Sequence, residues 1–342
     1  MAESAELQYE VVTKLSAKTP PGNIAVSPSG RIFISIHEFY NKRLRLAEVH
    51  PDGSVKPYPT KEWAFAAQQQ DSGGLYGVLG LNVDQHGILW MLDVSSDNAA
   101  GRLVAWNTNT ETLHRVIYLA EPVINAKSFL NDLSIDTKNN AVYIADTGQG
   151  AVIVVDLDTG LARRVLHSAK QTKAEDLLMV IDSKTVELGG APARLGINPI
   201  TIDNNFDYLY FGAMTGQSLY RIRTKDLLNQ NLSEKELVKK VERYGSKPIS
   251  DGITIDSVGN VYVTSITDSA IGVTTPDGKY KSLFQSEELP WPDGLAVGQD
   301  SFIYATVNEL HRSPMLNNGR DKSKGNFKII RFKALAPASI GR

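Results

Sequence analysis

One strand–turn–strand pattern recurs six times along the chain, and this repeat limits the possible folds more than any other feature. Each copy opens at a small or polar corner, runs into a short alternating strand, turns at Asp, Asn, Ser or Gly, and enters a second strand near an aromatic residue. Alternation with a period of two between turn residues is typical of half-buried β-strands. The six copies span residues 21–36, 79–94, 130–147, 197–214, 250–266 and 292–307.

The spacing of the copies predicts an all-β fold. Equivalent turn positions, from Ser27 to Gly298, lie 42 to 67 residues apart, which is room for one four-stranded sheet per copy. We therefore predict a six-bladed β-propeller in a single domain over residues 1–342, and the lack of a seventh copy favours six blades over seven. Because a ring of sheets must join its ends, strands at 7–15 and 326–335 are expected to complete the same blade.

Short helical insertions are expected between the sheets. The segment 169–180, AKQTKAEDLLMV, lies in the longest interval and has the composition of a helix. The segment 224–240 is a second candidate, because Ser233 and Glu236 have the spacing of a capping box.

Composition excludes several classes of function. The 342 residues carry a formal net charge of −2 and include no cysteine, so disulfides, thiolate nucleophiles and Cys-ligated zinc are excluded. The charge balance gives no general attraction to nucleic acid or to an anionic membrane, and neither is expected as a partner. The N-terminus shows no signal-peptide pattern and no stretch has the length of a membrane span. We expect a soluble protein, cytoplasmic as written and extracytoplasmic if a signal was removed.

Asn or Asp stands at the corner that opens each of the last four copies. In a propeller the strand nearest the axis begins at one mouth of the central channel, so equivalent corners converge there. In chain order these corners are Gly22, Leu79, Asn131, Asn198, Asp251 and Asp293, with Asp132 beside the third. Carboxylate and amide oxygens suit Ca²⁺ or Mg²⁺. The alternative is ordinary turn chemistry, in which these side chains cap backbone amides.

The histidines are weaker candidates. None of the six shows a zinc-binding spacing. His37 and His311 follow the second strands of the first and last copies, so both are candidates for ligand binding at a channel mouth. The alternative is that each is an ordinary surface or core histidine.

Several stretches of the chain together resemble the major royal jelly protein/yellow family. They are LWMLDV (89–94), GRLVAWNTNTETLHRVIYL (101–119), SFLNDLSIDTKNNAVYIADTGQGAVIVVDLDTGLARRVLHS (128–168), FDYLYFGAMTGQSLYRI (206–222), SDGITIDSVGNVYVTSITDSAIG (250–272), WPDGLAVGQDSFIYATVNELHR (291–312) and NFKIIRF (326–332). The resemblance implies a six-bladed propeller. The lack of cysteine and of a signal peptide departs from the secreted insect members and resembles a bacterial-type member.

The resemblance implies several functions. Some members of the family are linked to dopachrome isomerisation, others bind small amines in the channel, and others are storage proteins. The corners also resemble, more distantly, those of gluconolactonase/regucalcin propellers, which hold a divalent cation with a Glu, an Asn and an Asp. Asn198 and Asp251 match the Asn and the Asp, whereas Gly22 and Asn23 stand where the Glu is expected.

The leading hypothesis is a propeller that binds a small amine or catechol-like molecule at an acidic channel mouth and requires no cofactor. An enzyme is the alternative. A dopachrome-type isomerase with Asp251 or Asp293 as general base comes ahead of a hydrolase with Ca²⁺ or Mg²⁺ on Asn198 and Asp251. A protein-interaction scaffold follows from the fold alone.

Overall fold

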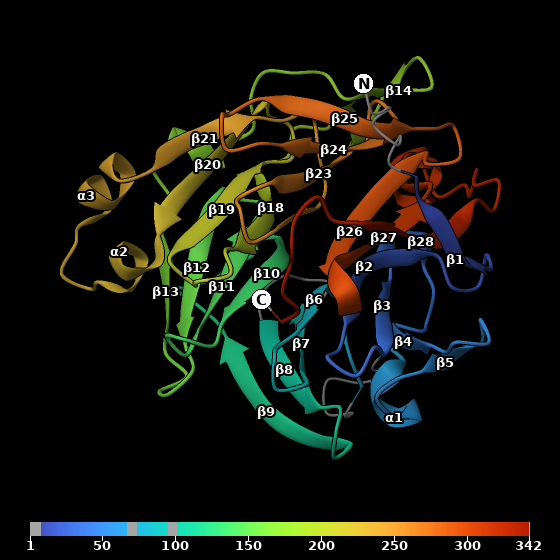
Figure 1. The fold of residues 1–342 in the computed structure, drawn as a ribbon, viewed down its shortest axis with the longest axis horizontal. Helices are drawn as coiled ribbons and strands as arrows, with labels where there is room; N and C mark the ends of the chain where they lie inside the picture. Colours follow the sequence, from blue (N-terminus) through green and yellow to red (C-terminus); the bar gives the residue numbers. More distant parts are fainter. Residues whose placement is uncertain (1–7, 67–73, 95–100, 342) are drawn as a thin grey trace, which may run out of the picture.

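Six antiparallel four-stranded sheets form a ring around a central channel (Figure 1). This computed structural model describes residues 8–66, 74–94 and 101–341. In each sheet the first strand after the corner lies nearest the axis, and the following strands lie progressively farther out. The prediction of a six-bladed β-propeller is confirmed.

The strands follow the chain blade by blade. Blade 1 consists of β2 (Pro21–Val26), β3 (Ile32–Ile36), β4 (Leu46–Val49) and β5 (Val55–Pro57). Blade 2 consists of β6 (Val78–Val83), β7 (Ile88–Val94), β8 (Gly101–Asn107) and β9 (Thr112–Leu119). Blade 3 consists of β10 (Leu130–Asp136), β11 (Ala141–Asp146), β12 (Ala151–Asp156) and β13 (Ala162–Val165). Blade 4 consists of β18 (Ile197–Ile202), β19 (Tyr208–Ala213), β20 (Ser218–Arg223) and β21 (Glu242–Ser246). Blade 5 consists of β22 (Ile253–Ile255), β23 (Val261–Ser265), β24 (Ala270–Thr274) and β25 (Tyr280–Gln285). Blade 6 consists of β26 (Trp291–Val297), β27 (Phe302–Asn308), β28 (Phe327–Lys333) and β1 (Glu10–Leu15).

The aromatic residue of the repeat anchors the turn that precedes it. In blade 3 the Tyr143 hydroxyl donates to Asp136 Oδ2 over 2.9 Å, and the other Asp136 oxygen accepts from the Asn139 amide. Blades 2 and 5 use the pairs Trp90–Asp84 and Tyr262–Asp256 in the same way. The aspartate therefore satisfies turn amides and the polar atom of a buried ring together, which explains why the two positions recur six or seven residues apart.

The two ends of the chain close the ring in blade 6. β1 pairs antiparallel with β28, from Glu10 opposite Arg331 to Leu15 opposite Phe327. This confirms the expected pairing of the terminal strands, although residue 7 of the predicted segment lies outside the described residues. Because the outermost strand comes from the N-terminus and the other three from the C-terminus, blade 6 forms only when both ends are in place.

The helical segments are short. They are α1 (Lys61–Ala64), α2 (Thr224–Leu228), α3 (Glu234–Lys239) and the 3₁₀ turns η1 (Glu38–Tyr40), η2 (Lys170–Thr172), η3 (Gln299–Ser301), η4 (Leu310–Arg312) and η5 (Met315–Asn317). The capping box at Ser233 and Glu236 is present in full and starts α3. The predicted insertion at 224–240 is therefore two helices.

The helix predicted over 169–180 is wrong. Only η2 forms there, and the chain then runs extended across the blade. The Glu175 amide donates to the Thr215 carbonyl of blade 4 rather than to a carbonyl four residues earlier. Tertiary hydrogen bonds of this kind outweigh a modest helix propensity. The insertion continues as two small hairpins, β14 (Val180–Ile181) with β15 (Lys184–Thr185) and β16 (Glu187–Leu188) with β17 (Ala191–Pro192).

The apolar core lies between neighbouring blades, face to face. The cluster between blades 2 and 3, for example, includes Leu92, Leu103, Leu133 and Ile144. At one end of the channel the C-terminal segment crosses the axis, where Gly341 lies against Gln85 of blade 2 (Figure 1). The hairpins of the insertion lie over the other end. Within the described ranges, no helix is long and apolar enough to cross a membrane.

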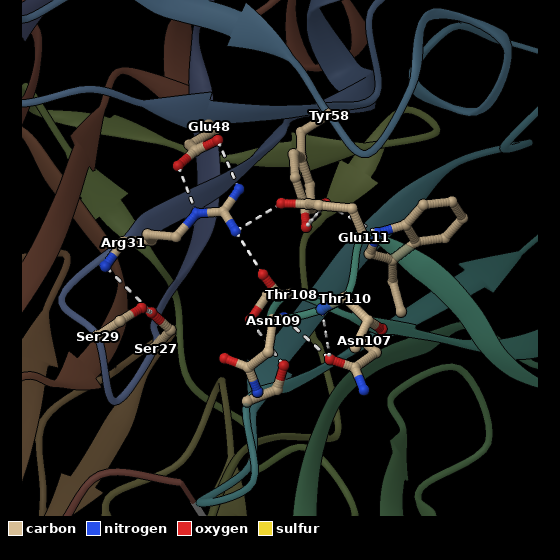
Figure 2. Close-up of polar contacts among 12 residues, drawn as sticks. Ser27, Ser29, Arg31, Glu48, Tyr58, Asn107, Thr108, Asn109, Thr110 and Glu111 are labelled. Carbon is tan, nitrogen blue, oxygen red and sulfur yellow. Dashed lines mark hydrogen bonds and ion pairs between the residues drawn. The ribbon is translucent and has the colours of Figure 1, made fainter.

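An arginine clamp joins blades 1 and 2 (Figure 2). Arg31 binds Glu48 of its own blade through two hydrogen bonds of 2.7 and 2.9 Å. Its Nη1 reaches into blade 2, where it donates to Glu111 Oε1 and to the Thr108 carbonyl, each over 2.7 Å. The Tyr58 hydroxyl donates to the second Glu111 oxygen over 2.8 Å. All of these bonds involve charged groups, which are the stronger kind of hydrogen bond.

We expect Arg31→Met to lower the free energy of unfolding by about 2 kcal/mol, because it leaves Glu48 without its partner and breaks the inter-blade bonds. Urea denaturation measures the change. Lys138→Met is the matched control, since Lys138 also joins two blades, through Asp207, but both side chains are more than half exposed. Its loss should stay below about 0.5 kcal/mol. Equal losses in the two variants would contradict the clamp.

Candidate functional site

A bulge interrupts the innermost strand of the blades at the corner of each repeat. The register shifts between Pro21 and Ile24, Val78 and Leu81, Leu130 and Leu133, Ile197 and Ile200, and Pro292 and Leu295. In blade 5 the equivalent pair, Asp251 and Gly252, directly precedes β22. Two residues per blade thus leave the ladder, and a bulge re-aims their side chains. In five of the six blades, one residue of the pair is Asn or Asp.

Hydroxyl groups of the second strands hold the bulges in place. Ser35 Oγ accepts from the Asn23 amide over 2.9 Å and donates to the Leu79 carbonyl of blade 2 over 3.0 Å. Thr264 Oγ1 accepts from the Gly252 amide over 2.9 Å, and Thr306 Oγ1 accepts from the Gly294 amide over 3.1 Å. The bulge geometry is therefore fixed by residues about twelve positions downstream, in the second strand of the same blade.

Three carboxyl groups meet at the bottom of the channel mouth, each with a neutral partner. Asp251 Oδ1 accepts from Asn198 Nδ2 over 2.6 Å, and its Oδ2 accepts from Trp291 Nε1 over 2.7 Å. Asp293 Oδ2 accepts from Asn308 Nδ2 over 2.7 Å. Asp132 Oδ1 accepts from Asn23 Nδ2 and from the Leu133 amide, over 2.9 and 2.8 Å. We call Asp132, Asp251 and Asp293 the acidic floor.

The acidic floor contains no basic partner, and its ionisation is correspondingly unfavourable. Burial, with a smaller contribution from the nearby Asp251, raises the pKa of Asp132 to about 7. Burial raises the pKa of Asp251 to about 6. Burial, followed by repulsion from Asp251 and Asp132, raises the pKa of Asp293 well above its usual range. At neutral pH the three groups share fewer than three negative charges, and a cation placed among them would relieve the repulsion.

A cavity of about 590 Å³ opens above the acidic floor. Its walls are largely apolar, with side chains from the blade tops, the inserted hairpins and the segment around η4 and η5. They include Phe39, Phe129, Met179, Leu195, Met214 and Leu310. The volume falls in the usual range for sites that bind small molecules. Because the C-terminal segment covers the opposite end, the cavity is a blind pocket with a polar bottom.

The two predicted histidines lie in different places. His37 lines the cavity and its Nδ1 accepts from the Phe39 amide over 3.2 Å, so a neutral ring carries its proton on Nε2. Burial lowers the pKa of His37 to about 3. His311 is not among the residues that line the cavity. Its ring stacks behind Trp291, with centroids 6.1 Å apart, and its Nε2 lies 3.4 Å from Asp182.

The structure brings most of the other predicted residues together. Asn131, Asp132, Asn198, Asp251 and Asp293 all line the cavity. Asn23, Trp291 and Asn308, which donate to the three carboxyl groups, were not predicted as site residues from the sequence. Asn23 and Asp132 occupy the second position of their bulges, whereas Asn198, Asp251 and Asp293 occupy the first. Only the register irregularity shows that both positions can face the channel.

The donor set does not fit the lactonase-type metal site suggested by Asn198 and Asp251. Both oxygens of Asp251 already accept hydrogen bonds from N–H groups, and Asn198 turns its amide nitrogen towards that carboxylate. The first blade offers Asn23 in place of a Glu, and its Nδ2 is bonded to Asp132. Over the part of the chain that the structure describes, no three His, Cys, Asp or Glu side chains are grouped as metal ligands.

Comparison with known proteins gives one family and one fold. The family model described as "Major royal jelly protein" matches residues 76–337. Comparison with curated protein sequences found no match. Solved structures resemble the whole chain at low sequence identity, which shows the shared propeller fold alone.

Three of these structures come from proteins with different descriptions. A regucalcin from Agrobacterium tumefaciens, described as a calcium-binding protein, has a TM-score of 0.58 at 14% identity, covering 98% of each chain. A luciferin-regenerating enzyme has a TM-score of 0.60 at 11% identity, also covering 98% of each. An inactive Staphylococcus aureus virginiamycin B lyase, solved with quinupristin, has a TM-score of 0.57 at 13% identity, covering 96% of this chain and 100% of that one.

Proposed function

This chain belongs to the major royal jelly protein family, and from that premise we propose that it binds a small organic cation, an amine on an apolar body, in the cavity above the acidic floor. The observation that carries the proposal is the meeting of Asp132, Asp251 and Asp293 beneath apolar walls with only neutral hydrogen-bond partners. Binding a cation there lowers the mutual repulsion of the carboxylates, and the walls take the apolar part of the ligand.

A metal-dependent hydrolase receives less support. The lactonase-type site uses a Glu, an Asn and an Asp, and here Asn23 stands in place of the Glu and donates to Asp132. Of the matched residues only Asp251 is a carboxylate, and both of its oxygens already accept N–H hydrogen bonds. The amine proposal uses the same negative charge without direct coordination and requires no cofactor.

A proton-transfer isomerase is the second candidate. The raised pKa values of Asp132 and Asp251, about 7 and about 6, suit groups that exchange protons near neutral pH. This hypothesis shares the site with amine binding and differs from it in one readout. An isomerase turns over dopachrome or a related aminochrome, whereas a binding protein only retains it.

The test of amine binding is calorimetry with 2-phenylethylamine as the probe. We expect its affinity to rise about tenfold between pH 5.5 and pH 8, because Asp132 and Asp251 lose their protons over this range while an alkylamine stays protonated. Binding should release protons, which titrations in buffers of different ionisation enthalpy detect. Asp132→Asn should lower the affinity about tenfold at pH 8 and flatten its pH dependence.

Two controls accompany this titration. 2-Phenylethanol has the same ring and chain without the charge, so its binding should be weak and independent of pH. EDTA should leave the affinity for the amine unchanged. Equal affinity for the amine and the alcohol would falsify the role of the acidic floor, and loss of amine binding in EDTA would restore the metal hypothesis.

A further inference from the structure

Arg45 lies on the wall of the same cavity, and its side chain has no ion-pair partner among the described residues. It lies in blade 1 immediately before β4, and its main chain is fixed: its amide donates to the Ala64 carbonyl over 2.7 Å, and its carbonyl accepts from the Ile36 amide over 2.9 Å. The side chain lines the cavity. Its Nε is buried and makes no hydrogen bond.

Other arginines in similar positions are paired. Arg102, which is buried in blade 2, donates from Nε to Asp93 Oδ2 over 2.7 Å and from Nη2 to the Gly74 carbonyl over 2.6 Å. Arg164 donates to the buried Asp146 over 2.7 Å. Among the described residues, no carboxylate lies within ion-pair distance of Arg45. Lys42 and Arg43 line the cavity as well, but of these three cations only Arg45 has a buried nitrogen, Nε, without a hydrogen bond.

Two acidic groups, Glu38 and Asp93, act on the Arg45 charge through space, and Asp93 is bonded to Arg102 instead. Glu38 also lines the cavity and interacts with Arg45 through space, without an ion pair. Burial raises the pKa of Glu38, which favours its neutral form. Burial also lowers the pKa of Arg45, the direction expected for a desolvated cation without a close anion. A half-buried guanidinium without a partner destabilises the folded protein, and an anionic ligand group would offset that cost.

We infer that the ligand is a zwitterion, in which an amine lies over the acidic floor and a carboxylate pairs with the guanidinium of Arg45. This inference rests on the proposed function and adds the second charged group to it. The cavity is lined by both sets of residues, so one molecule contacts Asp132 and Arg45 together. A planar carboxylate matches the two parallel N–H donors of a guanidinium, and the class of ligand is therefore an amino acid or a related amino-carboxylate.

Three related compounds distinguish the contribution of the ligand's amine to binding from that of its carboxylate. 2-Phenylethylamine carries the amine alone, phenylalanine adds a carboxylate on the neighbouring carbon, and 4-(2-aminoethyl)benzoate adds it at the far end of the ring. With the wild-type protein at pH 8, we expect at least one of the two amino-carboxylates to bind about tenfold more tightly than 2-phenylethylamine. Arg45→Met should remove this gain and leave the affinity for 2-phenylethylamine within about twofold. Arg45→Lys should restore part of it, because it returns the charge without the fork.

A second measurement distinguishes recognition from a structural role. Because the Arg45 side chain makes no hydrogen bond, Arg45→Met should be at least as stable as the wild type in thermal unfolding. Arg163→Met is the matched control: Arg163 Nη2 is also buried without a partner, but it lies on β13, away from the cavity. This variant should keep the full preference for the amino-carboxylate.

The outcomes separate the inference from the proposed function. If 2-phenylethylamine binds and neither amino-carboxylate binds more tightly, the zwitterion inference is wrong and amine binding stands. A gain that survives in Arg45→Met also contradicts the inference. If none of the three compounds binds, both the amine proposal and the inference are overturned.

Discussion

Asp132→Asn is expected to make the protein more stable at pH 8, by about 3 kcal/mol, and to leave its stability near pH 4 unchanged. The substitution keeps the shape of the side chain. Asp132 Oδ1 accepts both of the hydrogen bonds that fix this residue, from Asn23 and from the Leu133 amide, and an asparagine oxygen accepts them equally well. What disappears is a negative charge that the folded protein holds unfavourably.

The stability gain of Asp132→Asn follows from the number of protons that the folded and unfolded states of the wild type bind. Asp132 has a pKa of about 7 when folded, above the usual value for an unfolded chain. Between about pH 4 and pH 7 the folded state therefore binds more protons than the unfolded state, and the free energy of unfolding of the wild type falls as the pH rises through that window. The asparagine variant lacks this loss, so the difference between the two proteins grows up to pH 7 and then stays constant.

Asp136→Asn is the matched control, at the other end of the same strand, β10. Its Oδ2 accepts from both Asn139 Nδ2 and the Tyr143 hydroxyl. An asparagine nitrogen in that position would face two donors, so this variant should lose about 2 kcal/mol at both pH values. Urea titrations at pH 4.5 and pH 8 measure both variants. An Asp132→Asn variant less stable than the wild type at pH 8 would show that the charge is stabilised by its surroundings.

Gly252→Ala is expected to destabilise the fold by about 3 kcal/mol or more. A Cβ at this position would lie 2.3 Å from the backbone oxygen of Asp293 in the next blade and 3.3 Å from the Gly294 Cα. Backbone atoms of a neighbouring sheet cannot rotate away as a flexible side chain does, so the inner strands of blades 5 and 6 would have to separate. The same movement would displace Asp251 and Asp293 and weaken amine binding.

Gly101→Ala is the control for this substitution. Gly101, the first residue of β8, is also a buried glycine, but the nearest neighbours of an added Cβ would be side-chain carbons of Ile124 and Leu130 at 3.5 Å, an ordinary contact. We expect a change of less than about 1 kcal/mol. Thermal and urea unfolding measure both variants. If Gly252→Ala unfolds no more easily than Gly101→Ala, the close approach of the inner strands does not limit the fold.

The repeat could be predicted from the sequence because its cause is local. The alternation of the strands, the aspartate of the turn and the aromatic residue of the second strand all act within one hairpin, as the Asp136–Tyr143 bond illustrates. The pairing of β1 with β28 followed from the requirement that a ring of sheets joins its two ends. The helix predicted over 169–180 was wrong because the Glu175 amide takes its partner, the Thr215 carbonyl, from another blade, outside any local window.

Some residues of the candidate site could likewise be predicted from the sequence, whereas others could not. Asn131, Asn198, Asp251 and Asp293 stood out in the sequence because each blade repeats the corner, and Asp132 because it adjoins one. The tertiary structure alone shows which residues hold these carboxyl groups. Asn23 donates to Asp132, and Trp291 and Asn308 donate to the other two. It also shows that Arg45 lines the same cavity.

The sequence by itself determined six blades, a closed ring and a run of Asn and Asp at the blade corners, because those features repeat with the local pattern of each hairpin. Only the tertiary structure decided which of two bulge residues faces the channel in each blade, why glycine follows Asp251 and Asp293, and which cation is left without a partner. The physical reason is that these properties depend on distances between blades. The Cβ that Gly252 lacks would meet a backbone oxygen some forty residues later in the chain.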